Sequence, residues 1–304
     1  MKQDFLMITD FGRDDIFSVF ENGAKLKAET QSGKQHHLLK EQNLAMLFQK
    51  PSTRTRVSFE VGMNQLGGHA VYLSPAEVGL GKRESAADVA RVLSRFCDGI
   101  MARVFGHDIV EELARFATVP VVCGLSDLTH PCQVLGDMFT IYEHKGSFEH
   151  VHIAYVGDGN NVANSWVNLA SRLEIDLRIG CPKGHEPDAE LLKKAQDSGA
   201  GRIEIIHDPA EAVKDADVIY TDVWASMGQE KEAAERDKIF RPYQVNDALL
   251  EHADTRCIVL HCLPAHRGDE ITDAVIDGPH SVVFDEAENR LHIQKAILVH
   301  LMKK

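Results

Sequence analysis

The chain has 304 residues, of which 44% are hydrophobic, so it is long enough for two domains of about 150 residues each. Its net charge of −13 argues against nucleic acid and anionic membranes as partners, because both need a basic surface. An anionic small molecule would therefore need a local cationic pocket.

Bulk features also bear on the compartment. The N-terminal segment lacks the apolar core and cleavage site of a signal peptide, and no run approaches the roughly 18 apolar residues of a membrane span. The six cysteines include no CxxC pair and lie mostly in apolar runs, which is typical of buried thiols rather than of a disulfide framework. These features predict a soluble cytoplasmic protein.

Along the first half of the chain, short apolar runs alternate with amphipathic stretches, the pattern of a parallel sheet flanked by helices. We predict strands over residues 43–48, 69–73, 99–104 and 119–122. Helices are predicted over residues 53–66, 85–96 and 109–116. The first half is therefore predicted to be one α/β domain.

The same alternation resumes after a polar break at residues 143–147, which predicts a domain boundary between 143 and 144. A helix is predicted over 162–173 and a terminal helix over 293–302, whereas the highly charged segment 229–238 predicts a surface loop. Strands are predicted over residues 152–156, 176–179, 203–206, 218–221, 257–260 and 282–284. The second half is therefore predicted to be a second α/β domain.

The segment Ser52-Thr53-Arg54-Thr55-Arg56 lies where the first predicted strand gives way to a helix. The free N–H groups of a helix start favour an anion, hydroxyls add donors, and an arginine can hold two phosphate oxygens. A helix cap with surface arginines is the alternative, but three hydroxyls and two guanidinium groups within five residues favour an anion site. The glycines and the GK[ST] ending of a Walker loop are missing.

Polar side chains also follow two later strands. His130 and Gln133 are three residues apart, so a helical turn would present both on one side, where they could hydrogen-bond a carbonyl or a phosphate. Taken alone, the His-Pro pair is more often structural. Asp222 follows a strand end, where parallel sheets bind ligands, and could receive an ammonium group. A turn aspartate beside a buried Trp224 is an equal alternative.

One further segment begins like a dinucleotide-binding fingerprint. Gly157-Asp158-Gly159 follows a predicted strand, but Val162 stands where the third glycine should fall. Asn160 and Asn161 at the start of the next helix are better suited to hold a carboxylate or an amino group.

The segment from His261 to His266 contains possible metal ligands. His261, Cys262 and His266 could bind zinc, but no fourth ligand has the usual spacing, so we predict no metal. A nucleophilic Cys262 would need an adjacent base. Strand alternation is expected to turn His261 the other way, which argues against covalent catalysis.

In this order, the motifs resemble those of the ornithine carbamoyltransferases, in the aspartate/ornithine carbamoyltransferase family, over residues 3–304. The matching motifs are Ser-Thr-Arg-Thr-Arg at 52–56, His-Pro-Cys-Gln at 130–133, Asp-Val-Trp-Ala-Ser-Met-Gly at 222–228 and His-Cys-Leu-Pro at 261–264. The first two are shared, in some form, by carbamoyltransferases with different acceptors. The last two together indicate ornithine.

The resemblance implies a fold and an assembly. Each of two domains would be a parallel sheet flanked by helices, with residues 1–143 binding carbamoyl phosphate and residues 144–287 binding ornithine. The C-terminal helix, residues 288–304, would pack back on the first domain. Relatives are usually homotrimers or assemblies of trimers with active sites between subunits, and they need no metal or organic cofactor.

The resemblance also implies roles for single residues. Carbamoyl phosphate would be bound by Ser52, Thr53, Arg54, Thr55, Arg103, His130, Gln133, Cys262, Leu263 and Arg290. L-Ornithine would be bound by Asn161, Asp222, Ser226 and Met227. The implied catalytic residues are Arg54, Arg103, His130, Asp222 and Cys262. Arg56 is expected to be structural.

The implied reaction is attack of the ornithine δ-amine on the carbamoyl carbon, through a tetrahedral intermediate that expels phosphate and leaves L-citrulline. Because an alkyl ammonium has a pKa of about 10, the site must bind or generate the neutral amine. The developing oxyanion would be stabilised by Arg54, Thr55, Arg103 and His130. Closure of the loop at residues 226–228 would exclude water.

Two positions depart from the family pattern. Relatives commonly carry Gln or His where this chain has Gly79, and that side chain often reaches a neighbouring subunit's substrate. Either that contact is missing here or another residue, such as Lys82, supplies it. Cys123 stands where many relatives carry Asn.

Two alternatives remain open on the sequence. The acceptor could be putrescine or N-acetylornithine, although loss of the Ser-Met-Gly segment would then be expected. A non-catalytic relative would show gaps in the phosphate segment, and Gly79 is the one such gap. The physiological direction of the reaction and the size of the assembly are not readable from the sequence.

Overall fold

The structure is a computed structural model that describes residues 2–80, 83–147, 151–225 and 233–303. The chain forms two compact units. Unit 1 comprises Met1–Gly136 and Glu288–Lys304, and unit 2 comprises Asp137–Ala287. The change from unit 1 to unit 2 falls within helix α6 (Pro131–Lys145), and the boundary expected from the sequence, 143/144, lies near the end of the same helix.

Unit 1 is built around a four-stranded parallel sheet in the order β2-β1-β3-β4. Its strands are β1 (Asn43–Phe48), β2 (His69–Leu73), β3 (Gly99–Arg103) and β4 (Val121–Leu125). Its helical segments are η1 (Ile8–Asp10), α1 (Arg13–Gln31), α2 (Thr53–Gln65), α3 (Pro75–Val78), α4 (Ala86–Phe96) and α5 (His107–Phe116), together with the start of α6 and most of α13 (Val283–Met302).

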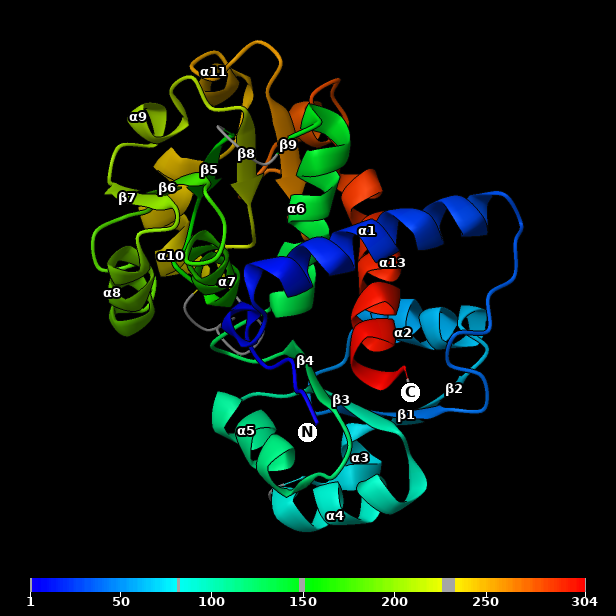
Figure 1. Cartoon of the computed structure of the whole chain (residues 1–304). Coiled ribbons are helices and arrows are strands. Elements are labelled where there is room, and N and C mark those ends of the chain that lie inside the picture. The colour runs from blue at the N-terminus through cyan, green and yellow to red at the C-terminus, as the bar shows by residue number, and fades with distance from the viewer. Residues whose placement is uncertain (1, 81–82, 148–150, 226–232, 304) are drawn as a thin grey trace. The chain divides into compact units, whose positions relative to one another are not determined.

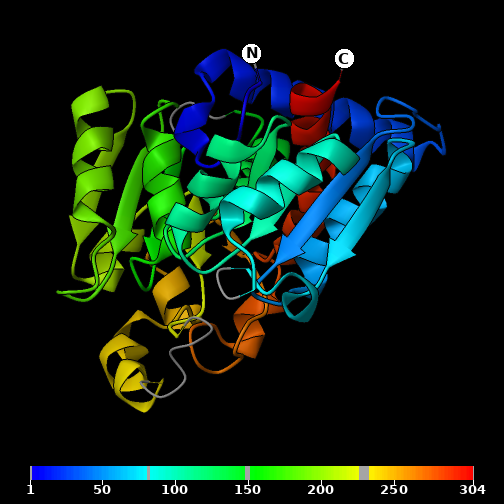
Figure 2. The same ribbon diagram turned by 90° about the horizontal axis from the view of Figure 1, so that it is seen from below.

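Helices cover both faces of this sheet (Figure 1). On one face, alternate residues of β1 and β3, such as Ala45 and Ile100, join Val89 of α4 and Leu113 of α5 in a buried apolar cluster. Helices α4 and α5, drawn in teal, lie in front of this sheet in the view from below (Figure 2). Because strand residues alternate between faces, Arg103 points to the opposite face, which α2 and α13 cover.

The C-terminal helix α13 packs on unit 1, as expected. Lys295 of α13 donates hydrogen bonds to Thr30 Oγ1 of α1 (2.9 Å) and Gln65 Oε1 of α2 (2.8 Å). A Cβ on Gly23 would lie only 2.7 Å from the side chain of Ile293, so α1 and α13 approach at a position where only glycine fits. The last residues of the chain thus complete the first domain.

Unit 2 contains a five-stranded parallel sheet in the order β7-β6-β5-β8-β9. Its strands are β5 (His152–Val156), β6 (Asp176–Gly180), β7 (Arg202–Ile206), β8 (Val218–Thr221) and β9 (Ile258–His261). Its helical segments are α7 (Asn161–Ala170), α8 (Ala189–Ser198), α9 (Pro209–Val213), α10 (Ala233–Phe240), η3 (Arg241–Tyr243), α11 (Asp247–Leu250) and α12 (Asp273–Ile276).

The central strands of the second sheet, β5 and β8, are also buried on both faces. Ala154 and Ile219 pack with Val213 and Val275 in one apolar cluster. Neighbouring residues of the same strands form an aromatic cluster, in which Tyr155 stacks on Tyr220 at 5.7 Å between ring centroids. In this cluster the ring of Trp166 from α7 meets Tyr220 edge-on. Strands buried on both faces explain why the sequence shows apolar runs rather than strict alternation.

Several elements differ from the sequence predictions. The strand predicted over 282–284 is wrong, because α13 already begins at Val283. Part of the predicted charged loop, residues 233–238, belongs to helix α10, while 229–232 lie outside the described residues. The long helix α1 was not predicted. Over the residues that the structure describes, no helix has the length and apolar character needed to cross a membrane.

The strand orders place one topological switch point in each sheet. In unit 1 the chain moves outward in opposite directions from β1 and β3, and in unit 2 from β5 and β8. Open parallel sheets bind ligands outside the carboxyl ends of strands at such points. Arg103 ends β3, and Asp222 directly follows β8. The switch points therefore lie beside Asp222, from one of the sequence motifs, and Arg103, which the family resemblance implies.

Candidate functional site

The first candidate site centres on Thr55, in the first turn of α2. Ser52 is the N-cap of this helix, and its hydroxyl oxygen accepts the N–H of Thr55 at 3.2 Å. The Thr55 hydroxyl oxygen accepts hydrogen bonds from Arg103 Nη1 at 3.4 Å and Arg290 Nη2 at 3.1 Å. Three distant segments, α2, β3 and α13, thus bring two guanidinium groups to one helix start.

His130 and Gln133 belong to the same cationic region of unit 1. Both are buried at the start of α6, and burial lowers the pKa of His130 well below its ordinary value. The charges of Arg290, Arg103 and Arg54 lower it further. His130 is therefore a neutral imidazole at pH 7, able to donate one hydrogen bond but carrying no charge of its own.

Gln49 and Lys50, which the sequence analysis did not select, fix the end of β1. The Gln49 side chain accepts the N–H of Phe105 at 2.9 Å, and its backbone N–H binds the Arg103 carbonyl at 2.8 Å. Lys50 is buried, pairs with Asp127 and lies over the ring of Phe105. These contacts hold the ends of β1 and β3 together. The one sequence feature that could have pointed to Gln49 and Lys50 is their position just before the 52–56 motif.

Other residues of the motif do not join Thr55. Thr53 is exposed, and Arg56 points outward, where it pairs with Glu60 at 3.2 Å and lies 4.0 Å over the ring of Tyr72. A structural role for Arg56 agrees with its expected exclusion from the ligand set. Arg54 is half-buried and near enough to His130 to affect its pKa.

Of the two departures from the family pattern, the structure explains Gly79 but not Cys123. Gly79 caps α3 with φ +54°, and a Cβ there would lie 2.8 Å from the Cβ of Arg83. A glycine therefore suits this turn, whereas a larger side chain would require a different one. Cys123 is fully buried, and burial raises its pKa to about 12. Lys82 lies outside the described residues.

The second candidate site lies in unit 2, where the loops after β5 and β8 meet. Asn160 Nδ2 donates to Asp222 Oδ2 at 2.8 Å. The thiol of Cys262, the residue after β9, donates to Asp222 Oδ1 at 2.9 Å. Burial and the neighbouring Asp222 carboxylate raise the pKa of Cys262 well above its ordinary value. Cys262 is therefore a neutral thiol rather than a nucleophilic thiolate.

Asn160 has a second role as the N-cap of α7. Its Oδ1 accepts the N–H groups of Val162 (2.8 Å) and Ala163 (3.2 Å) and the hydroxyl of Tyr155 (3.1 Å). Asn161, the residue selected from the sequence for the ornithine carboxylate, is the first residue of the helix and half-buried. Ser226 and Met227, expected beside Asp222, lie outside the described residues.

A buried hydrogen-bond pair shapes the turn that carries Cys262 and Leu263. His261 Nδ1 accepts the N–H of Leu263 at 2.9 Å, so Nε2 carries the proton and donates to Glu270 Oε1 at 3.0 Å. Leu263 adopts φ +54°, a conformation that non-glycine residues rarely take. The backbone at Leu263 is therefore fixed by a side chain within the same motif.

Two family models cover almost the whole chain. The aspartate/ornithine carbamoyltransferase carbamoyl-P binding domain matches residues 3–143, and the Asp/Orn binding domain of the same family matches residues 149–301. The chain belongs to the aspartate/ornithine carbamoyltransferase family. The match to the carbamoyl-P binding domain spans the Thr55 site apart from Arg290, and the match to the Asp/Orn binding domain spans the Asp222 site.

Individual carbamoyltransferases resemble the chain over its full length. The ornithine carbamoyltransferase of Syntrophus aciditrophicus is 55% identical to this chain. The alignment spans 98% of this chain and 99% of that protein. The anabolic ornithine carbamoyltransferase of Pyrococcus furiosus is 55% identical, covering 99% of this chain and 96% of that protein. A solved ornithine carbamoyltransferase structure from Pyrococcus furiosus superposes with a TM-score of 0.94 at 54% identity, covering 99% and 97% of the two chains.

The expectation that His261 turns away from Cys262 is wrong for this carbamoyltransferase. A ring nitrogen of His261, the Cys262 sulfur and an Asp222 oxygen lie within 4.8 Å of one another. Strand alternation fails here because β9 ends at His261 and the chain turns at Leu263. These groups could hold a metal only if the bonds of His261 to Leu263 and Glu270 and of Cys262 to Asp222 rearranged.

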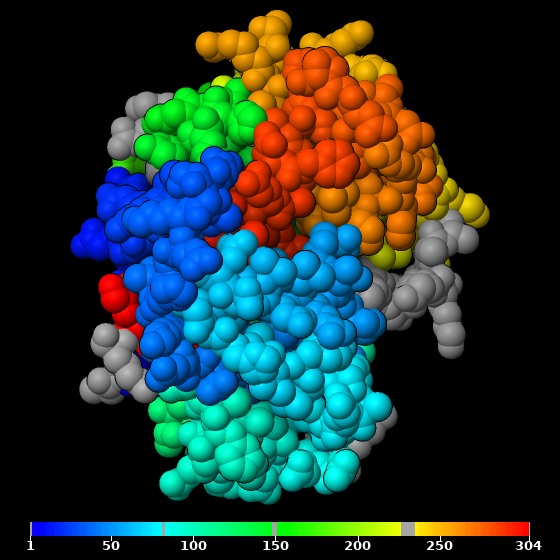
Figure 3. Space-filling model, turned by 90° about the vertical axis from the view of Figure 1, so that its right-hand side faces the viewer, coloured from blue at the N-terminus to red at the C-terminus, as the bar shows by residue number. Residues whose placement is uncertain are grey.

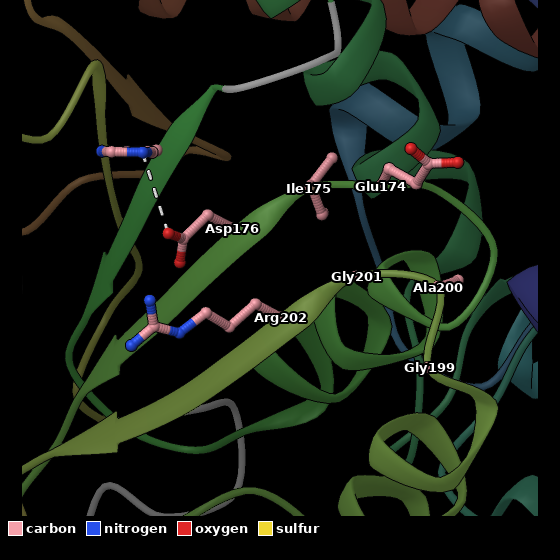
Figure 4. Close-up of a pocket in the computed structure, with 8 residues that line it drawn as sticks. Glu174, Ile175, Asp176, Gly199, Ala200, Gly201 and Arg202 are labelled. Atoms are coloured by element: carbon pink, nitrogen blue, oxygen red, sulfur yellow. Dashed lines mark ion pairs between the residues drawn. The ribbon is translucent and has the colours of Figure 1, made fainter.

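A hollow of about 470 Å³ lies at the amino ends of strands in the second sheet, away from the carboxyl ends that carry Asp222 (Figure 4). Its lining includes Asp176 and Arg202, which begin β6 and β7, and the glycine-rich turn 199–201. His152 and Asp176 pair on neighbouring strands of this lining, with His152 Nε2 3.8 Å from Asp176 Oδ2. Since ligands bind parallel sheets at the carboxyl ends of strands, we place the candidate site at Asp222 and not at this hollow.

Proposed function

We propose that this chain is an ornithine carbamoyltransferase, which transfers the carbamoyl group of carbamoyl phosphate to the δ-amine of L-ornithine and releases L-citrulline and phosphate. The observation that carries the proposal is the convergence of Arg103 and Arg290 on Thr55 at the start of α2. Full-length similarity to ornithine carbamoyltransferases supports ornithine as the acceptor. The expected roles of single residues follow as parts of this proposal.

The Thr55 site fits the phosphate end of carbamoyl phosphate. The N–H groups at the start of α2 and the hydroxyls of Ser52, Thr53 and Thr55 donate to phosphate oxygens. Arg54, Arg103 and Arg290 neutralise the anion, and a guanidinium can bind two oxygens at once. The chain as a whole carries a charge of −13, so this cluster supplies the local field that draws in an anion.

His130 and Gln133 are assigned to the carbamoyl group. A neutral His130 can donate to the carbonyl oxygen without competing with the arginines for the phosphate. As the amine nitrogen forms its bond to the carbamoyl carbon, the carbonyl electrons move to oxygen. The intermediate collapses by breaking the bond to the phosphate oxygen, and Arg54 and Arg103 stabilise both the oxyanion and the departing phosphate.

The Asp222 site is assigned to ornithine. The Asp222 carboxylate receives the α-ammonium group, and Asn161 at the start of α7 binds the α-carboxylate. Ser226 and Met227 are proposed to complete the pocket, and Cys262 and Leu263 to contact the reacting groups. The δ-ammonium loses one proton before attack, and the amine loses a second after the bond forms. Both protons leave with solvent or with the phosphate product.

A citrulline assay tests the activity. The purified protein is given carbamoyl phosphate with ornithine, N-acetylornithine, putrescine or aspartate, and each carbamoylated product is quantified. We expect citrulline from ornithine and little product from the other amines. Activity with putrescine alone, or with N-acetylornithine alone, would overturn the ornithine assignment. Absence of any product would favour a non-catalytic relative.

We also propose that the chain assembles as a homotrimer or a multiple of trimers. Helix α2 exposes Val57 (51% accessible) and Val61 (39%) one turn apart, and β2 is an unpaired sheet edge with Val71 38% accessible. The light-blue and cyan atoms of α2 and β2 cover much of the face in Figure 3. Apolar surface beside an open sheet edge favours association. Light scattering after size exclusion tests this, and a monomer mass would contradict it.

The remaining assignments concern the domains and the cellular role. We assign residues 1–143 with 288–304 to carbamoyl phosphate and residues 144–287 to ornithine. The free cysteines of the structure favour a reducing compartment, the cytoplasm. Similarity to a relative named as anabolic supports citrulline formation for arginine biosynthesis. A strain lacking its own ornithine carbamoyltransferase should grow without arginine when it expresses this chain.

A further inference from the structure

We propose that Arg236 is a positioning residue for the amino-acid substrate, because it ties the loop after β5 to the loop after β8 and thereby holds Asn160 against Asp222. The inference rests on the proposed function and adds to it a residue that neither the phosphate motif nor the Asp222 motif contains. Arg236 acts through other residues and is not itself assigned a contact with substrate.

The contacts of Arg236 reach both loops. Arg236 lies in α10 and is buried, with only 8% of its surface accessible. Its Nε donates to the carbonyl oxygen of Trp224 at 2.5 Å. Its Nη2 forms an ion pair with Asp158 Oδ2, also at 2.5 Å. The guanidinium also lies 5.0 Å from the ring centroid of Phe240, one helical turn further on.

These two contacts run parallel to the bond inside the ornithine site. Asp158 lies two residues before Asn160, and its carbonyl accepts the Asn160 N–H at 2.7 Å. Trp224 lies two residues after Asp222. Arg236 therefore spans the same two loops that the Asn160–Asp222 hydrogen bond joins at 2.8 Å. A shift of either loop would lengthen that bond and move the Asp222 carboxylate.

The local packing makes Asp158 a fixed anchor. Asp158 Oδ1 also faces His185 Nδ1 at 3.5 Å, and the Gly159 N–H binds the carbonyl oxygen of His185 at 2.8 Å. A Cβ on Gly159 would lie 2.3 Å from the backbone of Glu186, so the glycine serves close packing of this loop. The partial dinucleotide-like pattern noted in the sequence thus has a structural origin.

An arginine suits this bridge better than any other side chain. Its planar fork presents donors in two directions, whereas a lysine ammonium is a single point of charge. Burial of Asp158 raises its pKa, an effect that the charges of Arg236 and His185 oppose. A buried ion pair of this kind contributes little net stability. Its burial between two ligand-bearing loops therefore points to positioning.

The test compares variants of the Arg236–Asp158 pair with a variant of an exposed ion pair in the same unit. R236K keeps the charge, and the double variant R236M/D158N removes the bridge without leaving a buried charge. The control is R202M, since Arg202 pairs with Glu204 at 3.1 Å on the exposed edge of the same sheet. For each protein we would measure kcat, KM for both substrates, the melting temperature, and the Kd for L-norvaline, which has the α-groups of ornithine but no δ-amine.

We expect R236M/D158N to raise KM for ornithine and Kd for L-norvaline about 10- to 100-fold, because a shift of about 1 Å in a binding group has effects of this size. KM for carbamoyl phosphate should change less than about two-fold, a split that general destabilisation would not produce. R236K should lie between the parent and the double variant, and R202M should match the parent.

Two results would overturn the inference and leave the proposed function standing. One is a double variant whose KM for ornithine stays within about two-fold of the parent. The other is an equal rise in KM for both substrates with a lowered melting temperature, which would make Arg236 a general structural residue. A parent protein that forms no citrulline would instead overturn the proposed function, and Arg236 would then lose its assigned role.

Discussion

The two candidate sites occupy equivalent places in two parallel sheets but have opposite electrostatic character. At the switch point of unit 1, arginines from β3 and α13 reach the Thr55 hydroxyl at a helix start. At the switch point of unit 2, a carboxylate, an amide and a thiol form the chain Asn160–Asp222–Cys262. The first arrangement suits a phosphate, and the second suits an ammonium group.

This difference shows which kind of change each site tolerates. The Thr55 site depends on concentrated positive charge within an acidic chain, so each cation that reaches the ligand is hard to replace. The Asp222 site depends on hydrogen-bond geometry between loops. Loss of a guanidinium group at the first site should therefore cost more than loss of a single hydrogen-bond partner at either site, and the variants below test that ranking.

The largest effect is expected for Arg54→Ala. Loss of this guanidinium should lower kcat/KM for carbamoyl phosphate on the order of 1,000-fold, because it removes charge stabilisation from the phosphate and the oxyanion. Steady-state assays and carbamoyl phosphate binding measure the loss, and the melting temperature should stay near that of the parent.

The matched control for Arg54→Ala is Arg56→Gln, on the same helix. Arg56 stacks on Tyr72 and pairs with Glu60, so its loss should change turnover by less than about three-fold. If Arg54→Ala bound carbamoyl phosphate as tightly as the parent does, the assignment of the Thr55 site would be wrong.

A smaller effect is expected for Thr55→Val. The substitution keeps the shape of the side chain but removes the oxygen that accepts from Arg103 and Arg290, so both guanidinium groups lose a common anchor. We expect a loss of about 10- to 100-fold in kcat/KM for carbamoyl phosphate. Ser58→Ala, which removes a hydroxyl one turn along α2, should behave like the parent. Equal activity of both variants would remove Thr55 from its central position.

Unit 1 also contains a buried cation outside the phosphate site, Lys295. Burial lowers its pKa from the ordinary 10.5, which the lysine keeps in the unfolded chain, to about 8 in the folded protein. Between these two pH values the unfolded state binds more protons than the folded state, so stability due to Lys295 rises with pH. Relative to Lys295→Met, the parent should gain about 2 kcal/mol from pH 7 to pH 9.5.

Chemical denaturation of the parent and Lys295→Met at the two pH values measures this gain, and shared titrations cancel in the difference. If the stability difference between the parent and Lys295→Met did not change with pH, burial would not lower the pKa of Lys295. Such a result would remove the contrast between the arginines of the Thr55 site and Lys295, which packs α13 against α1 and α2.

The smallest effect concerns the thiol of unit 2. Burial and the Asp222 carboxylate raise the pKa of Cys262, so Asp222→Asn, which removes the second cause, should lower that pKa and increase the thiolate fraction. Alkylation of Cys262 by iodoacetamide at pH 8 should then be about 10-fold faster than in the parent. Mass spectrometry identifies the modified cysteine, and Cys97 serves as an internal reference. An unchanged rate at Cys262 would argue against its hydrogen bond to Asp222.

The α/β class, most strand positions and the motifs of both candidate sites could be predicted from the order of the amino acids. Hydroxyls and arginines at a strand-to-helix junction predict an anion site because helix starts expose N–H groups, and that reasoning needs no distant contacts. Strand prediction from residue type failed for residues 282–284. This Val-Val-Phe run has β propensity, but helix α13 begins within it. The prediction also missed α1, although its buried residues recur at helical spacing: Ile16, Val19, Phe20, Gly23 and Leu26.

Which residues join each motif depends on the folded chain. Arg290 lies 235 positions from Thr55, and the bond between them requires α13 to return to unit 1. Arg236 is one charge among many in a charged segment until folding places it between Asp158 and Trp224. Local sequence encodes helix starts and strand ends because these depend on neighbouring residues. Convergence of distant side chains depends on how sheets order their strands, and no local pattern records that order.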